Sequence, residues 1–358
     1  MQLLSAPQYP ANYLLLSVPA KTFVKFSFGI LVMTYYIGID IGGTKILAAV
    51  ATPEGCILAR AKRKTFSRDN KNTASMTLAQ RIAHTALDAA SKAGVDMREI
   101  EAVGVGAPGP TDIHTGHVFN TVNLPAWRQG FDLGPVLQDL LGPPVFVDND
   151  VNVGLLGEAR YGAAQDLDDV VGIFVGTGLG GAIMLDSQLR RGFRWGAGEV
   201  GHTYLYWPGN EPMEVEQIAS RGAISKELER AVRQGKSPIL AELLARRKDG
   251  RITSGVIRKA LDAGDQTTQK AVAQVQNTLA VLIASLANLL DPQAFVLGGG
   301  LVESLGEPFL EPIRKRARPL FFVRHRADEV QIVPAGLGDD SGVLGGVALA
   351  LELASAQP

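Results

Sequence analysis

The chain has 358 residues, of which 46% are hydrophobic and 20% are charged. A chain of this size can bury a large core and is expected to form two domains or lobes. Its formal net charge of −1 and the lack of a long Lys/Arg block exclude the broad basic footprint of a nucleic-acid-binding protein. The short run RKRAR at 314–318 is expected to be a solvated helix end. A single cysteine, Cys56, excludes internal disulfides and fits a reducing, cytoplasmic compartment.

Residues 1–32 differ in character from the rest of the chain. The apolar stretch Phe26–Ile41 is a poor membrane span, because its second half is better explained as the first strand and Lys25 precedes it. No positive side chain precedes the apolar run that begins at Leu14, which is atypical of a secretory signal. Met33 stands immediately before the first strand. We therefore interpret residues 1–32 as a disordered extension or a mis-assigned start.

The first strand begins a segment that reads YYIGIDIGGTKILAAVA, from Tyr35 to Ala51. β-favouring residues flank a Gly-Gly-Thr turn on both sides, which predicts a hairpin. A Walker A loop and a dinucleotide fingerprint both lead from a strand into a helix, so this context excludes them. An ordinary tight turn is the alternative interpretation. If the turn binds phosphate, it offers a carboxylate near a metal, closely approachable amides, a hydroxyl and a cation, from Asp40, Gly42, Gly43, Thr44 and Lys45.

The next elements are predicted from hydrophobic spacing and turn residues. They are a third antiparallel strand at 55–65, a helix at 72–94, a buried strand at 101–110, a strand at 143–150 and a helix at 151–162. The strand at 101–110 ends in a Gly-Pro turn and is expected to face a cleft, because sites gather at the carboxyl ends of such strands.

Asp150 stands at a strand-to-helix junction and is the candidate general base. A carboxylate that takes the proton of a substrate hydroxyl as its oxygen attacks the γ-phosphorus contributes roughly 10²- to 10⁴-fold. Phosphoryl transfer otherwise needs positioning and electrostatic stabilisation. The alternative interpretation is that Asn149 or Asp150 only caps the following helix, and the two roles are compatible.

A second glycine-threonine turn lies in VVGIFVGTGLGGAIML, from Val170 to Leu185. It predicts a second hairpin, with phosphate-binding glycines that are expected to need dihedrals which glycine alone adopts cheaply. Two such turns on either side of an Asn-Asp pair favour phosphate binding over an ordinary turn. The residues of this second turn are Gly176, Thr177, Gly178, Gly180 and Gly181.

A loop-rich segment at 190–215 follows, and within it GAGEVGH places Glu199 and His202 three residues apart, with Glu216 shortly after. Carboxylates and an imidazole suit several adjacent sugar hydroxyls. Such residues in a loop are otherwise surface residues, and their place after the second glycine turn favours a binding role.

Helices are expected to about residue 291, followed by a strand at 295–301 that breaks into three glycines and a C-terminal helix at 339–354. Both halves of the chain begin with a hairpin and continue as α/β. We therefore interpret the chain as duplicated, with two lobes around one cleft.

Seven segments in this order resemble the ROK family of bacterial sugar kinases and repressors. They are DIGGTKI at Asp40, GAPGPTD at Gly106, NLPAW at Asn123, DNDVNVGLLGEARYGAA at Asp148, VGTGLGGAI at Val175, GAGEVGH at Gly196 and VLGGGL at Val296. The resemblance covers about residue 34 to the end of the chain. It implies the α/β, two-lobed actin-like (ribonuclease-H-like) ATPase fold. We expect a small lobe at 33–147, completed by 339–358, and a large lobe at 148–338.

The resemblance also implies ATP with Mg²⁺, transfer to the 6-hydroxyl of a hexose, and a homodimer. Asp150 matches the family's catalytic base, both glycine turns match phosphate loops, and Mg²⁺ is expected near Asp40. Sugar contacts are implied for Asn123, Asn149, Glu199, His202 and Glu216, and glycines beside the adenosine for Gly298, Gly299 and Gly300.

One departure from the family concerns zinc. Many members follow the G-E-x-G-H motif with a C-x-C-G-x-x-G-C zinc knuckle, whose remaining ligand is that histidine. The corresponding stretch here, YWPGNEPMEVE, has no cysteine, and His202 alone cannot form a tetrahedral structural zinc site. We predict no structural zinc, with His202 and Glu216 held instead by packing around Trp207 and Pro208.

A glucokinase is the leading interpretation, with kinases for fructose, N-acetylglucosamine or N-acetylmannosamine, and polyphosphate as donor, as alternatives. A repressor of the same family needs an N-terminal helix-turn-helix with a basic recognition helix, and residues 1–32 carry only Lys21 and Lys25. A polymerising actin-like scaffold would not require the Glu199, His202 and Glu216 set. We therefore expect a hexose as partner, and neither nucleic acid nor membrane.

Overall fold

The computed structural model describes residues 34–66, 75–119, 121, 124–206, 211–247 and 249–356. Residues Thr34–Pro358 form one compact unit, and the description below concerns this unit alone. The extension predicted at 1–32 lies outside the described residues, as do Asn123, Trp207 and Pro208.

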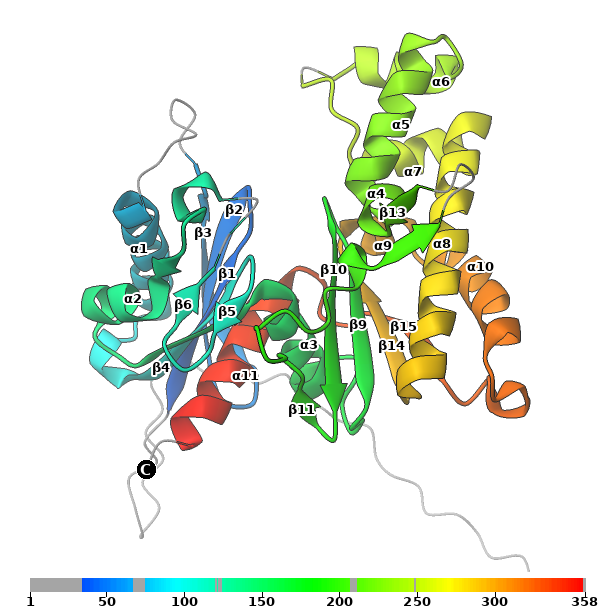
Figure 1. Ribbon diagram of the computed structural model, residues 1–358. Coiled ribbons are helices and arrows are strands. Elements are labelled where there is room, and N and C mark those ends of the chain that lie inside the picture. The colour runs from blue at the N-terminus through cyan, green and yellow to red at the C-terminus, as the bar shows by residue number, and fades with distance from the viewer. Residues whose placement is uncertain are drawn as a thin grey trace, which may run out of the picture. The chain divides into compact units, whose positions relative to one another are not determined.

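The first sheet has the strand order β3-β2-β1-β4-β8 (Figure 1). β1 and β2 form the predicted hairpin with β3 as its third antiparallel strand, while β4 and β8 run parallel to β1. Asp40, Gly106 and Asp148 pair in register across the three parallel strands, so the carboxyl ends of these strands share one edge. The bounds are β1 (Tyr35–Ile41), β2 (Lys45–Ala51), β3 (Ile57–Lys64), β4 (Ile100–Ala107) and β8 (Val145–Asn149).

The second sheet repeats this plan in the order β11-β10-β9-β14-β15. β9 and β10 form the second predicted hairpin, and β14 and β15 continue the sheet parallel to β9. The repetition of a hairpin followed by parallel strands confirms the predicted two-lobed α/β fold at the level of topology. The bounds are β9 (Val170–Val175), β10 (Leu179–Leu185), β11 (Gln188–Leu189), β14 (Ala294–Gly298) and β15 (Gln331–Pro334).

Helices cover both faces of the first sheet. α1 (Ser75–Ala93) and α2 (Leu133–Leu141) pack on the face that carries Ile37, Ile39 and Ile41, since alternate strand residues share a face. α11 (Ser341–Ser355) packs on the other face, where glycines allow close contact: a Cβ at Gly38 would lie 1.7 Å from the Val343 carbonyl oxygen.

Two helices lie between the sheets (Figure 1). α3 (Asp150–Tyr161) packs against α11 on one side and reaches β9 and β10 on the other. Buried Glu158 of α3 fixes the start of α11, because its carboxylate accepts hydrogen bonds from the amides of Gly336 and Leu337 and from the Ser341 hydroxyl. The strand-to-helix junction predicted at Asp150 is confirmed, since β8 ends at Asn149 and α3 begins at Asp150.

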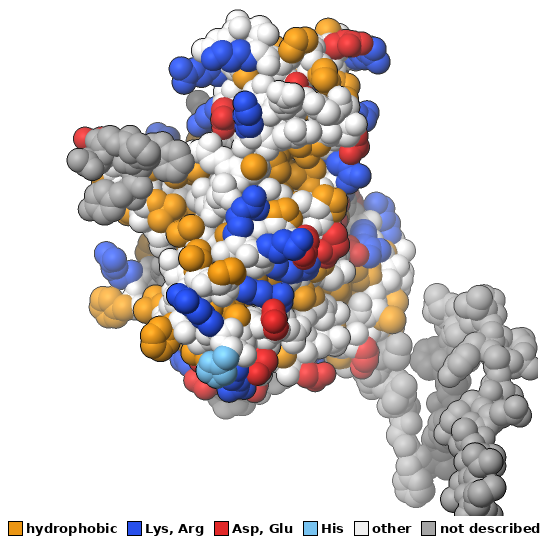
Figure 2. Space-filling model, turned by 90° about the vertical axis from the view of Figure 1, so that its right-hand side faces the viewer, with side chains coloured by type: hydrophobic (Ala, Val, Ile, Leu, Met, Phe, Trp, Pro, Cys, Tyr) orange, Lys and Arg blue, Asp and Glu red, His pale blue; other side chains and the backbone are white. Residues whose placement is uncertain are grey.

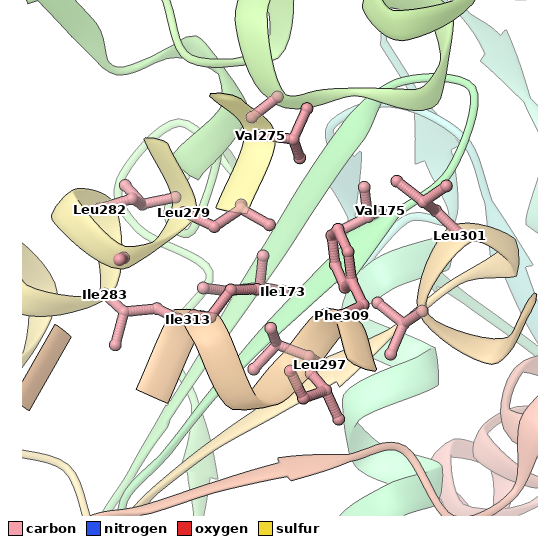
Figure 3. Packing of buried hydrophobic residues seen from close by; sticks show 14 of the residues in the cluster. Ile173, Val175, Val275, Leu279, Leu282, Ile283, Leu297, Leu301, Phe309 and Ile313 are labelled. Atoms are coloured by element: carbon pink, nitrogen blue, oxygen red, sulfur yellow. The ribbon is translucent and has the colours of Figure 1, made fainter. Parts of the chain in front are cut away.

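The largest apolar core lies in the second lobe (Figure 3). Ile173 and Val175 of β9 pack against α8 (Gln266–Leu290), α9 (Gly300–Leu305) and α10 (Glu307–Ala317). α8 is long and apolar enough to span a membrane by length and composition, but 61% of its most apolar window is buried, as in a core helix of a globular protein. The remaining α-helices are α4 (Glu216–Ala219), α5 (Arg221–Arg233), α6 (Pro238–Ala245) and α7 (Ser254–Asp262).

The short elements lie mostly in the segments between these. The segment 190–215, expected to be loop-rich, contains a two-stranded ladder of β12 (Tyr204–Tyr206) and β13 (Pro212–Glu214) and a 3₁₀ turn at Val200–His202. A small three-stranded sheet joins β5 (Thr111–Asp112), β6 (His117–Val118) and β7 (Phe131–Asp132).

The surface of the second lobe in Figure 2 carries interspersed acidic and basic side chains. The basic run at 314–318 falls at the end of α10, as predicted. Arg314 Nη1 lies 2.5 Å from Glu307 Oε2, and Lys315 pairs with Glu311. Neighbouring carboxylates therefore offset part of the charge of the basic run.

Candidate active site

The carboxyl edge of the first sheet gathers two acidic side chains. Asp40 is the penultimate residue of β1 and lies against the start of α11, where a Cβ at Gly342 would come within 2.8 Å of its carboxyl carbon. Asp150 begins α3, and Gly106 of β4 leaves room for its backbone, because a Cβ there would lie 3.3 Å from the Asp150 Cα. The two carboxylates are close enough for Asp40 to raise the pKa of Asp150.

Asp150 has the electrostatic character of a base. Burial, followed by the charges of Asp40 and Glu199, raises its pKa from 3.8 to about 7. Its side chain is half-buried, so it is largely surrounded by protein yet still reachable. Oδ1 accepts a hydrogen bond from the Val151 amide at 3.0 Å, and a carboxylate keeps further lone pairs for a substrate hydroxyl.

Asp40 is the second perturbed carboxylate. Burial raises its pKa to about 6, with Lys45 lowering it and Asp339 raising it. Lys45 Nζ, which the sequence assigned to phosphate binding, lies 2.8 Å from Asp339 Oδ1 and is therefore ion-paired. A half-buried carboxylate at a phosphate turn fits Mg²⁺, which takes one or two protein carboxylates and completes its shell with phosphate oxygens and water.

Asn149 caps α3, as in the alternative interpretation of the Asn149–Asp150 pair. Its Oδ1 accepts from the amides of Val151 at 2.9 Å and Asn152 at 3.2 Å, and its Nδ2 donates to the Gly109 carbonyl. An amide nitrogen carries two hydrogens, so one donor remains for a sugar hydroxyl. The cap also fixes the position of Asp150.

Both glycine-threonine turns expose amides. Within the described residues, Gly43 and Thr44 of the first turn, and Thr177 and Gly178 of the second, have backbone N–H groups without a hydrogen-bond partner. Consecutive free amides in a tight turn form an anion-binding concavity. Each turn therefore presents amide donors suited to phosphate oxygens.

The start of α5 orients the second turn. The amides of Arg221 and Gly222 donate to the carbonyls of Gly176 and Thr177, which leaves the amides of the turn facing away from α5. Arg221 Nη2 also donates to Thr177 Oγ1 at 2.5 Å. A guanidinium thus stands beside this turn, where a phosphate would need a cation.

The physical reason expected for the turn glycines is wrong. None of Gly42, Gly43, Gly176, Gly178, Gly180 and Gly181 has a positive φ, so no special dihedral is needed. Close approach is the constraint at some of them: a Cβ at Gly178 would lie 2.3 Å from Glu216 Oε2, and one at Gly180 would lie 2.5 Å from Val151 Cγ2, whereas a Cβ at Gly43 or Gly176 would meet no atom closer than 3.9 Å. Among the predicted glycines the dihedral argument applies only to Gly299, which follows β14, has φ +88° and is the N-cap residue of α9.

A cavity of about 840 Å³ lies beside the turns. Of the predicted residues, Thr44, Thr177 and Gly300 line it, which brings the first lobe, the second turn and the start of α9 together. Sequence reasoning missed the polar side chains that complete the wall, among them Arg221, Arg251, Ser254 and Glu303. These side chains lie in segments whose sequence predicts only helix starts and loops. One example is the segment at Ser220, which is the N-cap residue of α5.

The residues predicted to bind sugar form a second group, next to Asp150. Burial raises the pKa of Glu199, with His202 lowering it and Glu216 raising it, so these three side chains are neighbours. Glu216 Oε2 accepts from the Leu179 amide at 2.7 Å, which ties this group to the second turn. The predicted contact Asn123 lies outside the described residues.

His202 is held by a residue that the sequence did not single out. Its Nδ1 lies 3.4 Å from Glu214 Oε2, and Glu214 ends the β12–β13 ladder. The β12–β13 ladder lies in the segment that corresponds to the zinc knuckle of other family members. The predicted packing around Trp207 and Pro208 lies outside the described residues.

The prediction of no structural zinc is testable by elemental analysis. Among the described residues, no group of three or more His, Cys, Asp or Glu side chains is placed to hold a metal ion. Purified protein is expected to contain no stoichiometric zinc after dialysis against a weak chelator. A tightly bound equivalent of zinc per chain would contradict the prediction.

Two sheets of this order, with α3 and α11 between them, define the two-lobed actin-like fold. The crystal structure of a ROK family glucokinase from Streptomyces griseus, in complex with glucose and AMPPNP, matches with a TM-score of 0.75 and 33% identity over 89% of this chain and 99% of that one. The profile of the ROK family matches residues 36–353, and the chain belongs to this family.

Relatives in the family differ in activity. The glucokinase of Halalkalibacterium halodurans is 32% identical over 318 residues, 87% of this chain and 93% of that protein. The xylose repressor of Caldicellulosiruptor bescii is 29% identical over 266 residues, 73% of this chain and 65% of the repressor. Membership of the family is therefore compatible with a kinase and with a repressor.

Proposed function

We propose that this protein is an ATP-dependent hexose kinase that phosphorylates the 6-hydroxyl of glucose. The observation that carries the proposal is the position of Asp150, whose pKa of about 7 suits a general base and whose neighbours are Asp40 and the sugar-side acid Glu199. The glucokinase relatives, at about a third identity, support glucose as the sugar.

In the proposed reaction, Glu199, His202, Glu216 and the free Asn149 donor bind the ring hydroxyls and orient the 6-hydroxyl toward Asp150. The Asp150 carboxylate takes the hydroxyl proton as the sugar oxygen bonds to the γ-phosphorus of ATP. The bond from that phosphorus to the bridging oxygen breaks, and ADP leaves. Amides of the two turns and Arg221 hold the phosphates in line. When bound at Asp40, Mg²⁺ would neutralise charge on the phosphate oxygens.

The cavity favours a nucleotide over polyphosphate as donor. Beyond the two turns it continues to Arg251, Ser254 and Gly300, and its volume of about 840 Å³ is in the range that accommodates a cofactor-sized ligand. AMPPNP bound to the glucokinase of Streptomyces griseus supports the same choice. We also propose a cytoplasmic homodimer, and lobes at 33–147 with 339–358 and at 148–338.

The experiment that tests the proposal is a coupled ADP-release screen with glucose, fructose, mannose, N-acetylglucosamine and N-acetylmannosamine. Glucose is expected to give the highest kcat/KM. Turnover confined to fructose or to an N-acetylhexosamine would change the proposed substrate from glucose to that sugar and leave the proposed kinase activity standing. Tight sugar binding without ADP release for any of the five would point to the sensing role of the family's repressors and overturn the proposal.

The pH dependence follows from the raised pKa of Asp150. The base must be ionised to accept a proton, so kcat/KM for the hexose is expected to rise with pH through a limb near 7. Rates measured from about pH 5.5 to 9 test this, and a flat profile would contradict the assignment of the base.

A further inference from the structure

The loop between β11 and Glu199 holds Trp195 in an unusual backbone conformation. Trp195 has φ +59°, a left-handed value that a bulky residue rarely adopts. The loop is closed by hydrogen bonds from the Ala197 amide to the Arg191 carbonyl and from the Trp195 amide to the Gly192 carbonyl. Such strain persists only where the surroundings over-determine it, and it concentrates at functional sites.

The start of this loop, at Arg191, is attached to β8, the strand that precedes Asp150. Arg191 Nε lies 2.7 Å from Asp148 Oδ2, and the Asp148 side chain is only 1% exposed. Asp148 Oδ1 in turn accepts from the Asn149 amide at 2.7 Å. The loop that carries Trp195 is therefore positioned directly by the residues that precede Asp150.

The side chain of Trp195 meets His114 of the first lobe. The two ring centroids are 5.5 Å apart with an interplanar angle of 72°, an edge-to-face contact. His114 lies between β5 and β6, in a segment that begins just after Gly109, and the Gly109 carbonyl accepts from Asn149 Nδ2 at 3.2 Å. One loop from each lobe, each fastened to residues 148–149, thus ends in this aromatic pair.

The loop that carries Trp195 continues into a residue proposed to bind sugar. Trp195 precedes the proposed sugar residue Glu199 by four positions, and neither Trp195 nor His114 lines the cavity assigned to the nucleotide. Both rings are attached beside the residues that orient the sugar. They can therefore limit what extends from a bound hexose.

We infer that Trp195 and His114 form a size filter over the hexose, which admits an unsubstituted sugar and disfavours one carrying an N-acetyl group. This inference rests on the proposed function and deepens it, because it assigns the choice between glucose and an N-acetylhexosamine to two named residues. One misfitting group in a pocket typically changes discrimination by roughly 10- to 200-fold.

The test compares Trp195→Gly with Phe193→Ala. Glycine adopts a positive φ without strain, so the first variant is expected to fold. Phe193 is in the same loop and its side chain is 100% exposed, which makes it a matched control. Calorimetry gives Kd for glucose and for N-acetylglucosamine in each protein, with the wild-type chain as reference.

Trp195→Gly is expected to shift the ratio of the two Kd values at least about tenfold toward N-acetylglucosamine. His114→Ala should shift the ratio in the same direction by less, and Phe193→Ala should leave it unchanged. An unchanged ratio in Trp195→Gly, an equal shift in Phe193→Ala, or a wild-type preference for N-acetylglucosamine would overturn the filter. Calorimetry measures binding without turnover. A failure to release ADP would therefore count against the proposed kinase activity and not against the size filter.

Discussion

Asp150→Asn is expected to lower kcat by a factor of roughly 10² to 10⁴ while hexose binding stays measurable. The amide has nearly the shape of the carboxylate and can keep the hydrogen bond from the Val151 amide, but it cannot take the proton of the 6-hydroxyl. Coupled ADP release gives kcat, and calorimetry gives Kd for the sugar. Asp139→Asn, at an exposed position on α2, is the matched control and should behave as wild type.

Thermal stability separates this loss of activity from damage to the fold. Burial and two like charges raise the folded pKa of Asp150 to about 7, above its ordinary 3.8, so ionisation of this carboxylate lowers the free energy of unfolding as pH rises through that window. Asp150→Asn removes this penalty and should raise Tm above about pH 7. Full activity in the variant, or a lowered Tm together with lost activity, would count against the assigned base.

Gly178→Ala is expected to raise the KM for the hexose by roughly tenfold or more. Its new Cβ would lie 2.3 Å from Glu216 Oε2 and push that carboxylate off the Leu179 amide. The displaced carboxylate would lose its proposed hydrogen bond to a sugar hydroxyl. A hydrogen bond to a charged group contributes about 1.5–3 kcal/mol, which corresponds to this change in affinity for the hexose. Steady-state kinetics with the hexose and with ATP varied in turn measures the effect, and Gly178→Val should also weaken ATP binding.

The control for this substitution lies two residues away. A Cβ at Gly176 would meet no atom closer than 3.9 Å, so Gly176→Ala should leave both Tm and the KM for the hexose unchanged. Any rise in its KM for ATP would then report the close approach of phosphate to the turn. Equal hexose KM values in the two alanine variants would show that the link from Glu216 to the second turn does not matter for sugar binding.

The hairpins and the position of Asp150 were predictable because local signals agree there. Runs of β-favouring residues on both sides of each glycine turn define β1, β2, β9 and β10, and the apolar strand before Asp148 stops where helical spacing begins. These are properties of neighbouring residues. A single sequence therefore carries them.

The rest of the site depends on contacts between distant segments. Arg221 becomes a candidate phosphate ligand only because the start of α5 folds against the Gly176–Gly178 turn, and Glu214 matters only because the β12–β13 ladder brings it to His202. The turn glycines were predicted as residues, but with the wrong cause. At Gly178 and Gly180 the constraint comes from the side chains of Glu216 and Val151, which lie elsewhere in the sequence.

Phosphorus NMR of a mixture of the protein, MgATP and glucose most directly tests whether Asp150 activates the 6-hydroxyl for attack on ATP. The wild-type chain is expected to produce ADP and, in equal amount, a phosphate monoester resonance coupled to the two C6 protons of the sugar, and Asp150→Asn should produce neither at a comparable rate. Accumulation of ADP with inorganic phosphate alone, or a phosphate ester on another hydroxyl, would contradict this mechanism.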